Sequence, residues 1–485
     1  MKFKQLIKVL GSLFDREDFE VKGVSPNSKN VQDGFIFVAI SGTHDDGHEF
    51  IDEAIKRGAK AIVVESSKLK TQRLLKVPFI AVGDTRKALA QLSARFYGSP
   101  SRKIKVVGIT GTNGKTTITY LIEALLKEAG FNPAVIGKVN YRFKDKIIPS
   151  KNTTPGPVEL QSMLSEMLSN EVDYVIMEVS SHALDQQRVE GINFHCAIFT
   201  NLTQDHLDYH ATMEKYFSAK AKLFKNLDPG AYAVINNDDA YAHRIKELTK
   251  AKIITYGIDN RSDISATKMQ FSMNYTKFSV SSQKQDFNIK SRLIGRHNVY
   301  NILSGVAFAL EEGINPEVIK NAIEKFSLVP GRLERIESDA GFAVFVDYAH
   351  TEDALTNAIN TLRPLSGNRV IVVFGCGGDR DKTKRPKMGR AATELADYAI
   401  ITNDNPRSED PQAIIDGIRK GIKKENFCVI PQRMQAIRRS LEMAKTGDIV
   451  LVAGKGHESY QILSNRTEYF DDRQAVRECL RSLKL

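Results

Sequence analysis

The sequence has no tryptophan, few cysteines and no long apolar run. Its four cysteines are far apart and form no C-x-x-C pair, which argues against a structural zinc site and a disulfide framework: Cys196, Cys376, Cys428 and Cys479. No apolar stretch approaches the length of a membrane span, and Lys8 interrupts the only candidate signal-peptide core. We therefore expect a cytoplasmic protein without membrane insertion.

Basic residues moderately outnumber acidic ones. Lys and Arg number 69 and Asp and Glu number 58, so the formal net charge is +11. Such a surface attracts anions, which could be nucleic acid, acidic lipid or small polyanionic substrates. Because the basic residues are scattered and tryptophan is absent, nothing in the pattern favours a nucleic-acid groove. We expect a monomer that binds small anionic substrates and no nucleic acid.

The order of strand-like and helix-like segments predicts an α/β fold with three domains in series. A chain of 485 residues is too long for one core. Short strands are expected at 34–40, 60–65 and 78–82, with helices at about 48–58 and 84–96, and turn residues near 100 end this unit. The predicted domains are 1–100, 101–328 and 329–485.

The second predicted domain alternates strands with helices from Lys105, which indicates a mostly parallel sheet covered on both faces. Residues 263–293 have alternating strand patterns without a helix between them, so we expect an antiparallel addition there. After residues 329–332 a third α/β pattern begins, with strands in FAVFVDY, RVIVVFG, DYAIIT and DIVLVAG. This third domain is predicted to be Rossmann-like.

The stretch VVGITGTNGKTT, residues 106–117, predicts a phosphate loop of unusual form. The common G-x-x-x-x-G-K-[ST] pattern would place a glycine where this chain has Ile109. The context nevertheless fits, because an apolar strand enters the glycines and a helix begins at Lys115. In that geometry backbone N–H groups and the helix dipole bind an anion, Lys115 adds a charge, and the Thr116 hydroxyl can bind Mg²⁺.

This register of the loop resembles that of the Mur ligases and folylpolyglutamate synthetases. Further motifs of the Mur ligase family follow in order along the whole chain: NTTP, MEVSSHAL, TNLTQDHLDYH, AKAKLF, GRHNVYN, PGRLE, DYAHT, GGDRDKTKRP, DNPR and GKGHE. The resemblance implies three domains: an N-terminal domain for a UDP-substrate, a central ATP-binding phosphate-loop domain and a C-terminal amino-acid-binding domain. It is strongest to the ligase that adds the third stem-peptide residue of peptidoglycan to UDP-N-acetylmuramoyl-L-alanyl-D-glutamate.

The resemblance implies ATP and Mg²⁺ as cofactors and an acyl-phosphate intermediate. A site that handles a carboxylate and a triphosphate needs cations and fixed donors more than a protein nucleophile. Glu178 ends the apolar strand DYVIMEV at the edge where α/β sheets bind ligands. The implied catalytic residues are Lys115, Glu178, His206 and Lys220, and the implied metal ligands are Thr116, Glu178, His206 and Lys220. We interpret His195, inside a strand, as structural.

Lys220 is predicted to carry a carbamate. By composition it is one lysine among several on a helix, since Lys215, Lys222 and Lys225 lie nearby. In the family the matching lysine carries a CO₂-derived carboxylate that helps to hold a second magnesium. A carbamate requires a neutral amine, so the surroundings would have to lower the pKa of this lysine.

The remaining implied contacts fall into three sets. The ATP set is Gly111, Thr112, Asn113, Gly114, Lys115, Thr116, Thr117, Asn298, Arg332 and Asp347. The set for the UDP-muramoyl-dipeptide is Ser28, Thr43, His44, Asp45, Asn152, Thr153, Thr154, Ser180, Gln186 and Arg188. The set for meso-diaminopimelate is Arg380, Asp404, Asn405, Pro406, Arg407, Gly454 and Glu458. Asn27 and Lys29 depart from the D-S-R triplet that relatives commonly carry around Ser28.

Arg407 is predicted to determine which amino acid the protein adds. It follows Asn405 and Pro406 in a rigid turn after an apolar strand, so its side chain is expected to be pre-positioned. Meso-diaminopimelate has a carboxylate at its far carbon that L-lysine lacks, and arginine binds a carboxylate through two parallel bonds. We therefore predict meso-diaminopimelate as the amino acid added.

Three alternatives remain from the sequence. One is the lysine-adding enzyme or another Mur or folylpolyglutamate-type ligase, although the roughly 100-residue unit before the loop argues against the folate enzyme. The second is a nucleic-acid-stimulated NTPase, which leaves DNPR and GKGHE unexplained. The third is a non-catalytic nucleotide-binding module, which is disfavoured by the joint presence of Lys115, Glu178, His206 and Lys220.

Overall fold

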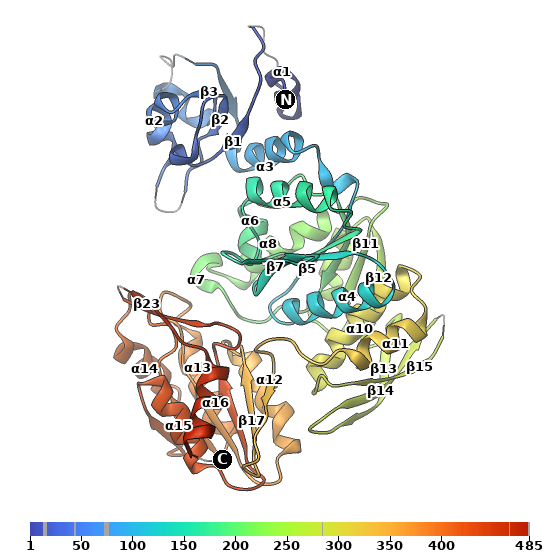
Figure 1. The fold of residues 1–485 in the computed structure, drawn as a ribbon, viewed down its shortest axis with the longest axis vertical. Helices are drawn as coiled ribbons and strands as arrows, with labels where there is room; N and C mark the ends of the chain where they lie inside the picture. Colours follow the sequence, from blue (N-terminus) through green and yellow to red (C-terminus); the bar gives the residue numbers. More distant parts are fainter. Residues whose placement is uncertain (13–16, 43–44, 72–76, 284, 465, 484–485) are drawn as a thin grey trace.

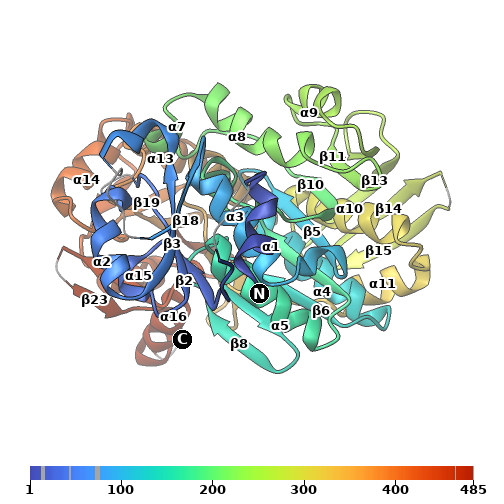
Figure 2. The same ribbon diagram turned by 90° about the horizontal axis from the view of Figure 1, so that it is seen from above.

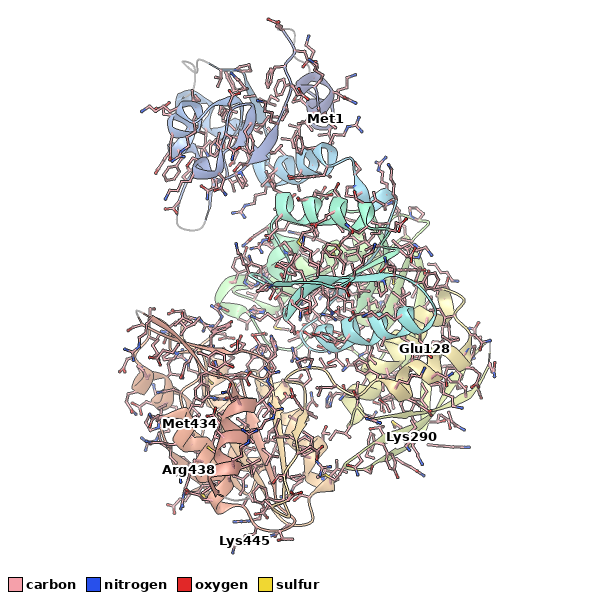
Figure 3. All side chains as sticks on the ribbon, in the orientation of Figure 1. Met1, Glu128, Lys290, Met434, Arg438 and Lys445 are labelled. Atoms are coloured by element: carbon pink, nitrogen blue, oxygen red, sulfur yellow. The ribbon has the colours of Figure 1, made fainter. Side chains whose placement is uncertain are left out.

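Three α/β units follow one another along the long axis of the molecule (Figure 1). The structure is a computed structural model that describes residues 1–12, 17–42, 45–71, 77–283, 285–464 and 466–483. Side chains fill the layers between the sheets and their helices in each unit (Figure 3). The N-terminal unit lies at one end and the C-terminal unit at the other, and seen from above the N-terminal unit overlies the C-terminal one (Figure 2).

The N-terminal unit is a four-stranded parallel sheet in the order β1-β2-β3-β4. Its elements are α1 (Phe3–Ile7), β1 (Gly23–Ser25), β2 (Phe35–Val38), α2 (Ile51–Lys56), β3 (Ala59–Glu65), β4 (Phe79–Val82) and α3 (Thr85–Phe96). The three predicted strands and two helices are confirmed, whereas β1 was not predicted. Helix α3 begins where the Asp84 carboxylate accepts hydrogen bonds from the backbone N–H groups of Arg86 and Lys87.

The central unit contains an eleven-stranded sheet in the order β15-β14-β13-β12-β11-β10-β5-β9-β6-β7-β8. The strands are β5 (Lys105–Thr110), β6 (Pro133–Ile136), β7 (Asn140–Phe143), β8 (Lys146–Pro149), β9 (Tyr174–Glu178), β10 (Phe194–Phe199), β11 (Tyr232–Asn236), β12 (Lys252–Gly257), β13 (Ile264–Phe271), β14 (Thr276–Ser282) and β15 (Phe287–Ser291). The strands from β6 to β13 in this order pair in parallel, and β14 and β15 add antiparallel as expected. A second antiparallel addition, β7 and β8 on the opposite edge, was not predicted.

Helices cover both faces of the central sheet, as the sequence predicted. They are α4 (Lys115–Glu128), α5 (Pro157–Ser169), α6 (Ser181–Asp185), α7 (Leu207–His210), α8 (Met213–Lys225), α9 (Ala242–Leu248), α10 (Arg296–Glu311) and α11 (Pro316–Lys325). Helices α4, α10 and α11 share one buried apolar core with the sheet, and α5, α8 and α9 share the other. A sheet buried on both faces explains the nearly continuous apolar runs of its middle strands.

The C-terminal unit has a six-stranded sheet in the order β16-β17-β21-β18-β19-β20, in which only β16 runs antiparallel among the described strands. Its strands are β16 (Glu334–Ile336), β17 (Ala343–Asp347), β18 (Val370–Phe374), β19 (Tyr398–Ile401), β20 (Phe427–Val429) and β21 (Ile449–Ala453), followed by the hairpin of β22 (Tyr460–Leu463) and β23 (Arg466–Tyr469). The helices are α12 (Glu352–Leu362), α13 (Lys384–Leu395), α14 (Pro411–Arg419), α15 (Arg433–Met443) and α16 (Asp472–Leu483). The four predicted strands are confirmed.

The three sheets occupy residues 23–82, 105–291 and 334–453. The domain boundaries at residues 100 and 328 stay predictions. No helix in the described part of the chain is long and apolar enough to cross a membrane.

Candidate active site

The phosphate loop joins the end of β5 to the start of α4. Gly111 and Gly114 have φ angles of 149° and 90°. A Cβ on Gly111 would lie 1.8 Å from the Thr200 hydroxyl oxygen, so only glycine fits against the neighbouring loop. Lys115 Nζ donates to the carbonyl oxygens of Gly111 at 2.9 Å and Thr112 at 2.8 Å. Burial lowers the pKa of Lys115.

Thr116 and Glu178 meet beside this loop, because β5 and β9 are neighbours in the sheet. The Thr116 hydroxyl donates to Glu178 Oε1 at 3.0 Å, and the Lys138 backbone N–H donates to the same oxygen at 2.9 Å. Both side chains are buried. A hydroxyl and a carboxylate oxygen are ligand types that suit Mg²⁺, so this pair fits the predicted metal. Within the described residues, no group of three or more His, Cys, Asp or Glu side chains is arranged to hold a metal ion.

Lys220 is the buried lysine of α8. Its side chain is 1% exposed, and Nζ donates to the Gly111 carbonyl oxygen at 2.7 Å. Burial, with the nearby Lys115 charge, holds the pKa of Lys220 well below its usual value. The neighbouring Lys215 and Lys225 are exposed instead. The structure therefore separates Lys220 from the other lysines of its helix and places it against the phosphate loop.

His206 lies in the loop between β10 and α7, in a left-handed conformation with φ of 55°. Its ring centroid is 4.9 Å from that of His182, which follows β9. Its side chain is 36% exposed. His206 thus borders the same edge of the sheet as Glu178.

A cavity of about 350 Å³ lies beside the phosphate loop, between the central and C-terminal units. Six of the predicted ATP contacts line it: Asn113, Gly114, Thr117, Asn298, Arg332 and Asp347. Arg332 also donates from Nη2 to the Thr116 hydroxyl at 3.3 Å, which links the nucleotide cavity to the predicted metal pair. The carboxylate of Asp347 accepts from the Leu333 N–H at 2.6 Å, and burial raises its pKa.

His297 and Asp353 are among the cavity residues that were not predicted from the sequence. His297 precedes Asn298 on α10, and Asp353 comes from the first turn of α12. Asp353 Oδ2 accepts from the Asn113 side-chain amide at 2.7 Å, so the C-terminal unit touches the phosphate loop directly. His297 lies within the quoted motif GRHNVYN and Asp353 lies two residues after DYAHT, but these positions alone do not assign a contact.

The residues predicted to hold the muramoyl-dipeptide gather at the end of β9. The Thr154 hydroxyl donates to the Glu178 carbonyl oxygen at 2.8 Å and accepts from the Ser180 N–H at 3.1 Å. Arg188 donates to the Thr154 carbonyl oxygen at 3.1 Å and to Gln186 Oε1 at 2.6 Å. Thr153 and Asn152 precede Thr154 in the same loop. This group therefore adjoins the Glu178 carboxylate.

The predicted uridine contacts belong to the N-terminal unit, apart from the phosphate loop. Ser28 donates to Glu53 Oε2 at 2.7 Å, and the Asp45 carbonyl oxygen accepts from the Gly42 N–H at 2.8 Å. Thr43 and His44 lie outside the described residues. At the two departures from the common triplet, the Asn27 side chain accepts from the Lys29 N–H at 3.0 Å, which caps the following turn.

The predicted amino-acid contacts converge at the carboxyl ends of β18, β19 and β21. Asn405 donates from its amide to Glu458 Oε2 at 3.0 Å. Gly454 has φ of 118°, and a Cβ there would lie 2.7 Å from Asp404 Oδ2. Arg407 Nη1 donates to the Gly378 carbonyl oxygen at 2.7 Å. The other two members, Arg380 and Pro406, flank this cluster in the same two loops.

Two lysines that the sequence analysis did not assign border this cluster. Lys138 Nζ, from the central unit, lies 3.5 Å from Glu458 Oε1. Lys455 is fully buried and donates to Asn405 Oδ1 at 3.2 Å. Burial lowers the pKa of Lys455. Lys455 stands inside the quoted GKGHE motif, whereas no motif contains Lys138.

The site combines a phosphate loop, a cavity beside it that a second α/β unit closes, and an adjoining cluster of charged side chains. This combination is typical of a nucleotide-dependent enzyme. Three family models match the chain: the Mur ligase family catalytic domain at residues 20–97, the Mur ligase middle domain at 109–309 and the Mur ligase glutamate ligase domain at 331–456. The chain belongs to the Mur ligase family, and it is an ATP-dependent ligase.

Full-length relatives support this membership. The UDP-N-acetylmuramoyl-L-alanyl-D-glutamate--2,6-diaminopimelate ligase of Clostridium tetani is 42% identical over 100% of both chains. The protein of the same name from Syntrophomonas wolfei is 43% identical over 99% of both chains. A solved structure with this name is 32% identical, with a TM-score of 0.71 and coverage of 99% of both chains.

More distant solved structures share the fold. MurF ligase from Thermotoga maritima in complex with ADP is 20% identical, with a TM-score of 0.64 and coverage of 95% of this chain and 97% of that one. A folylpolyglutamate synthase of Mycobacterium tuberculosis covers only 76% of this chain, at 17% identity and a TM-score of 0.64.

Proposed function

We propose that this protein joins an amino group of meso-diaminopimelate to the D-glutamyl carboxylate of UDP-N-acetylmuramoyl-L-alanyl-D-glutamate, with conversion of ATP to ADP and phosphate. The names of its full-length relatives support both substrates. The observation that carries the proposal is the Lys138–Glu458 contact of 3.5 Å. It brings the amino-acid cluster of the C-terminal unit next to the loop that binds Glu178 in the central unit.

In the first step, a carboxylate oxygen of the substrate attacks the γ-phosphorus of ATP, and ADP leaves. An acyl phosphate forms, which has a good leaving group where the carboxylate had none. Lys115, Arg332 and the backbone N–H groups of the phosphate loop are suited to stabilise the charge on the transferred phosphoryl group. Arg188, beside Thr154, is suited to position an anionic part of the dipeptide substrate.

Magnesium would neutralise phosphate oxygens during this step. The residues that would hold it are Thr116 and Glu178, together with His206 and a carbamate on Lys220.

In the second step, the neutral amine of the amino acid attacks the acyl carbon, phosphate leaves, and the amine loses a proton as the amide forms. The cluster around Arg407, Arg380 and Glu458 would hold the far end of diaminopimelate, which carries both a carboxylate and an ammonium group. Two arginines match the carboxylate, and Glu458 matches the ammonium. We infer that this reaction belongs to the cytoplasmic synthesis of peptidoglycan precursors.

The direct test is phosphate release by the purified protein with ATP, Mg²⁺ and the UDP-muramoyl-dipeptide, with candidate amino acids added one at a time. Meso-diaminopimelate should support the highest kcat/KM. Higher kcat/KM with L-lysine would assign the chain to the lysine-adding alternative. ATP hydrolysis that needs DNA or RNA instead would contradict the ligase proposal.

A further inference from the structure

Three consecutive residues of the central unit, Thr203, Gln204 and Asp205, contact the C-terminal unit. The Thr203 hydroxyl donates to Asp353 Oδ2 at 3.4 Å. The Gln204 amide donates to the Thr383 hydroxyl at 2.9 Å. Asp205 lies at the centre of this contact. The loop that carries His206 is therefore a docking point for the C-terminal unit.

Asp205 is buried, with 6% of its surface exposed, and two cationic or ionisable side chains of the C-terminal unit face it. Lys384 Nζ lies 3.8 Å from Asp205 Oδ1, and His350 Nε2 lies 3.7 Å from Asp205 Oδ2. Lys384 is itself buried, and within the described residues Asp205 is its only carboxylate partner. Burying a charge without a partner costs free energy, so Asp205 and Lys384 each reduce the cost of burying the other.

Asp205 also fixes the backbone of His206. Its Oδ1 accepts from the His206 N–H at 2.9 Å, and its Oδ2 lies 3.4 Å from His206 Nε2. His206 has a positive φ of 55°, a conformation that a residue with a Cβ adopts at some cost. The same carboxylate thus holds His206 on one side and the C-terminal unit on the other.

We propose that Asp205 is a positioning residue that couples docking of the C-terminal unit to the conformation of His206. When Lys384 and His350 are in place, the Lys384 charge and the His350 ring hold the Asp205 carboxylate where it binds the His206 N–H. When the C-terminal unit moves away, Asp205 loses its cross-unit partners and is free to rotate towards water. The His206 loop is then held less firmly. Assembly of the site for phosphoryl transfer thereby depends on the unit that binds the amino acid.

A simple structural ion pair would stabilise the docked arrangement without transmitting anything to the loop. The two roles differ in what the loss of Lys384 does, because Lys384 forms an ion pair with Asp205, whereas in the described part of the chain no hydrogen bond joins Lys384 to His206. Under the proposal, Lys384→Met loosens the loop at residues 200–210. Under a purely structural role, that loop keeps its wild-type protection.

The test compares three variants: Asp205→Asn, Lys384→Met and the control Lys382→Met. The Asp205→Asn variant keeps an oxygen for the His206 N–H but removes the charge. Lys382 lies two residues from Lys384, is 70% exposed and pairs with Glu409, so its replacement removes the same charge without affecting Asp205. The first readout is amide hydrogen exchange at residues 200–210 in the substrate-free protein, which does not depend on the proposed function.

We expect exchange at residues 200–210 to rise at least about threefold in Lys384→Met and Asp205→Asn, and to stay at the wild-type rate in Lys382→Met. The second readout rests on the proposed function: kcat should fall about tenfold or more in both variants, while KM for the UDP-substrate changes less than about threefold. The Asp205→Asn/Lys384→Met double variant should be no worse than the poorer single variant, because both act through one contact.

Unchanged exchange in Lys384→Met, or losses of kcat that multiply in the double variant, would overturn the coupling. If the wild-type protein catalysed no ligation at all, the proposed function would fail, and the exchange measurement would still decide the coupling.

Discussion

Lys220 Nζ donates to the carbonyl oxygen of Gly111, the first residue of the phosphate loop, at 2.7 Å. The pKa of this lysine is lowered by burial and by the charge on Lys115, so the neutral amine is favoured. The neutral amine is the form that reacts with CO₂. A carbamate nitrogen keeps one N–H, so the bond to Gly111 can persist after modification while a carboxylate is added beside Lys115.

We predict that Lys220 is carbamylated and that Lys220→Ala has little activity, part of which returns when acetate or another short carboxylic acid is added. The added acid can supply the missing negative charge near the metal. The measurements are phosphate release with increasing acetate, and ¹³C NMR of wild-type protein in ¹³CO₂. Lys222→Ala, on the same helix, is the control. Full wild-type activity in CO₂-free buffer with an unmodified Lys220 would contradict the prediction.

Lys115→Ala is expected to abolish ligation. Lys115 Nζ donates to two carbonyl oxygens of the phosphate loop, so its charge is placed where we expect the γ-phosphate to bind. Losing one pre-placed stabilising group of this kind costs about 10²–10³ in kcat. The control is Lys127→Ala, which removes an exposed lysine from the same helix. Near-normal turnover by folded Lys115→Ala protein would rule out the phosphate-loop assignment.

The sequence was sufficient for the elements with a strong apolar pattern. Strands such as Val370–Phe374, which is fully buried, stand out as apolar runs between turns. The hairpin of β7 and β8 was missed because its strands have only four residues each and β8 is mostly exposed. A short strand of this kind depends on the neighbouring strand for its stability, which a local pattern does not record.

The candidate site also has features that the sequence could predict and features that it could not. The phosphate loop could be predicted because strand, glycines, lysine and helix are contiguous in the chain. Contacts such as Lys138–Glu458 and Asp205–Lys384 join residues that are far apart in sequence and belong to different units. They arise from how the units dock, so no spacing in the sequence reveals them. The roles of the predicted ligand contacts stay predictions, although most of the described ones lie in three clusters.

A polar cluster at the opposite edge of the central sheet allows a prediction about stability and pH. Glu312, the C-cap of α10, accepts hydrogen bonds from Lys105 at 2.7 Å and from Tyr232 at 2.7 Å, and lies 2.6 Å from His195 Nε2. Burial alone would raise the pKa of Glu312, but these partners lower it overall. The contact gives His195 a structural partner, in line with its interpretation from the sequence.

Because the pKa of Glu312 is lower in the folded state than in the unfolded one, its charge stabilises the protein above the unfolded value of about 4.5. That stabilisation is lost as the pH falls through the folded value. Glu312→Gln should therefore destabilise the central unit by about 1–3 kcal/mol at pH 7, a range that allows for the half-exposed Lys105. The difference from wild type should shrink at pH 3.5.

The measurement is urea denaturation at both pH values, with the transition of the central unit followed separately. Glu311→Gln is the matched control, since Glu311 pairs with the exposed Lys252 on the surface. A Glu312→Gln effect that is equal at pH 7 and pH 3.5 would mean that lost packing, and not the charge, is responsible.

Arg407 is expected to determine which amino acid the protein adds. Arg407 has φ of 54°, and its backbone N–H donates to the Ile462 carbonyl oxygen at 3.1 Å. Its Nη1 donates to the carbonyl oxygens of Gly378 at 2.7 Å and Asn405 at 3.5 Å, and within the described residues its Nε and Nη2 make no hydrogen bond. The guanidinium is therefore pre-positioned with N–H groups left to bind a substrate carboxylate. Asp404 and Glu458 lie in the same cluster, so the site can also accept an ammonium group.

Replacing Arg407 should weaken binding of meso-diaminopimelate by about 2–5 kcal/mol, because its far carboxylate would lose one of its two arginine partners. L-lysine has no carboxylate there, so its kcat/KM should change little and the preference for diaminopimelate should shrink.

Alanine at position 407 also strains the left-handed backbone, whereas asparagine tolerates it, so Arg407→Asn separates the lost charge from the strain. Arg407→Ala and Arg407→Asn should show the same loss of preference. Arg419→Asn, at an exposed position on α14, serves as the control. The deciding quantity is the ratio of kcat/KM for the two amino acids. If wild type prefers lysine, or if Arg407→Asn leaves the ratio unchanged, Arg407 is not the selectivity residue.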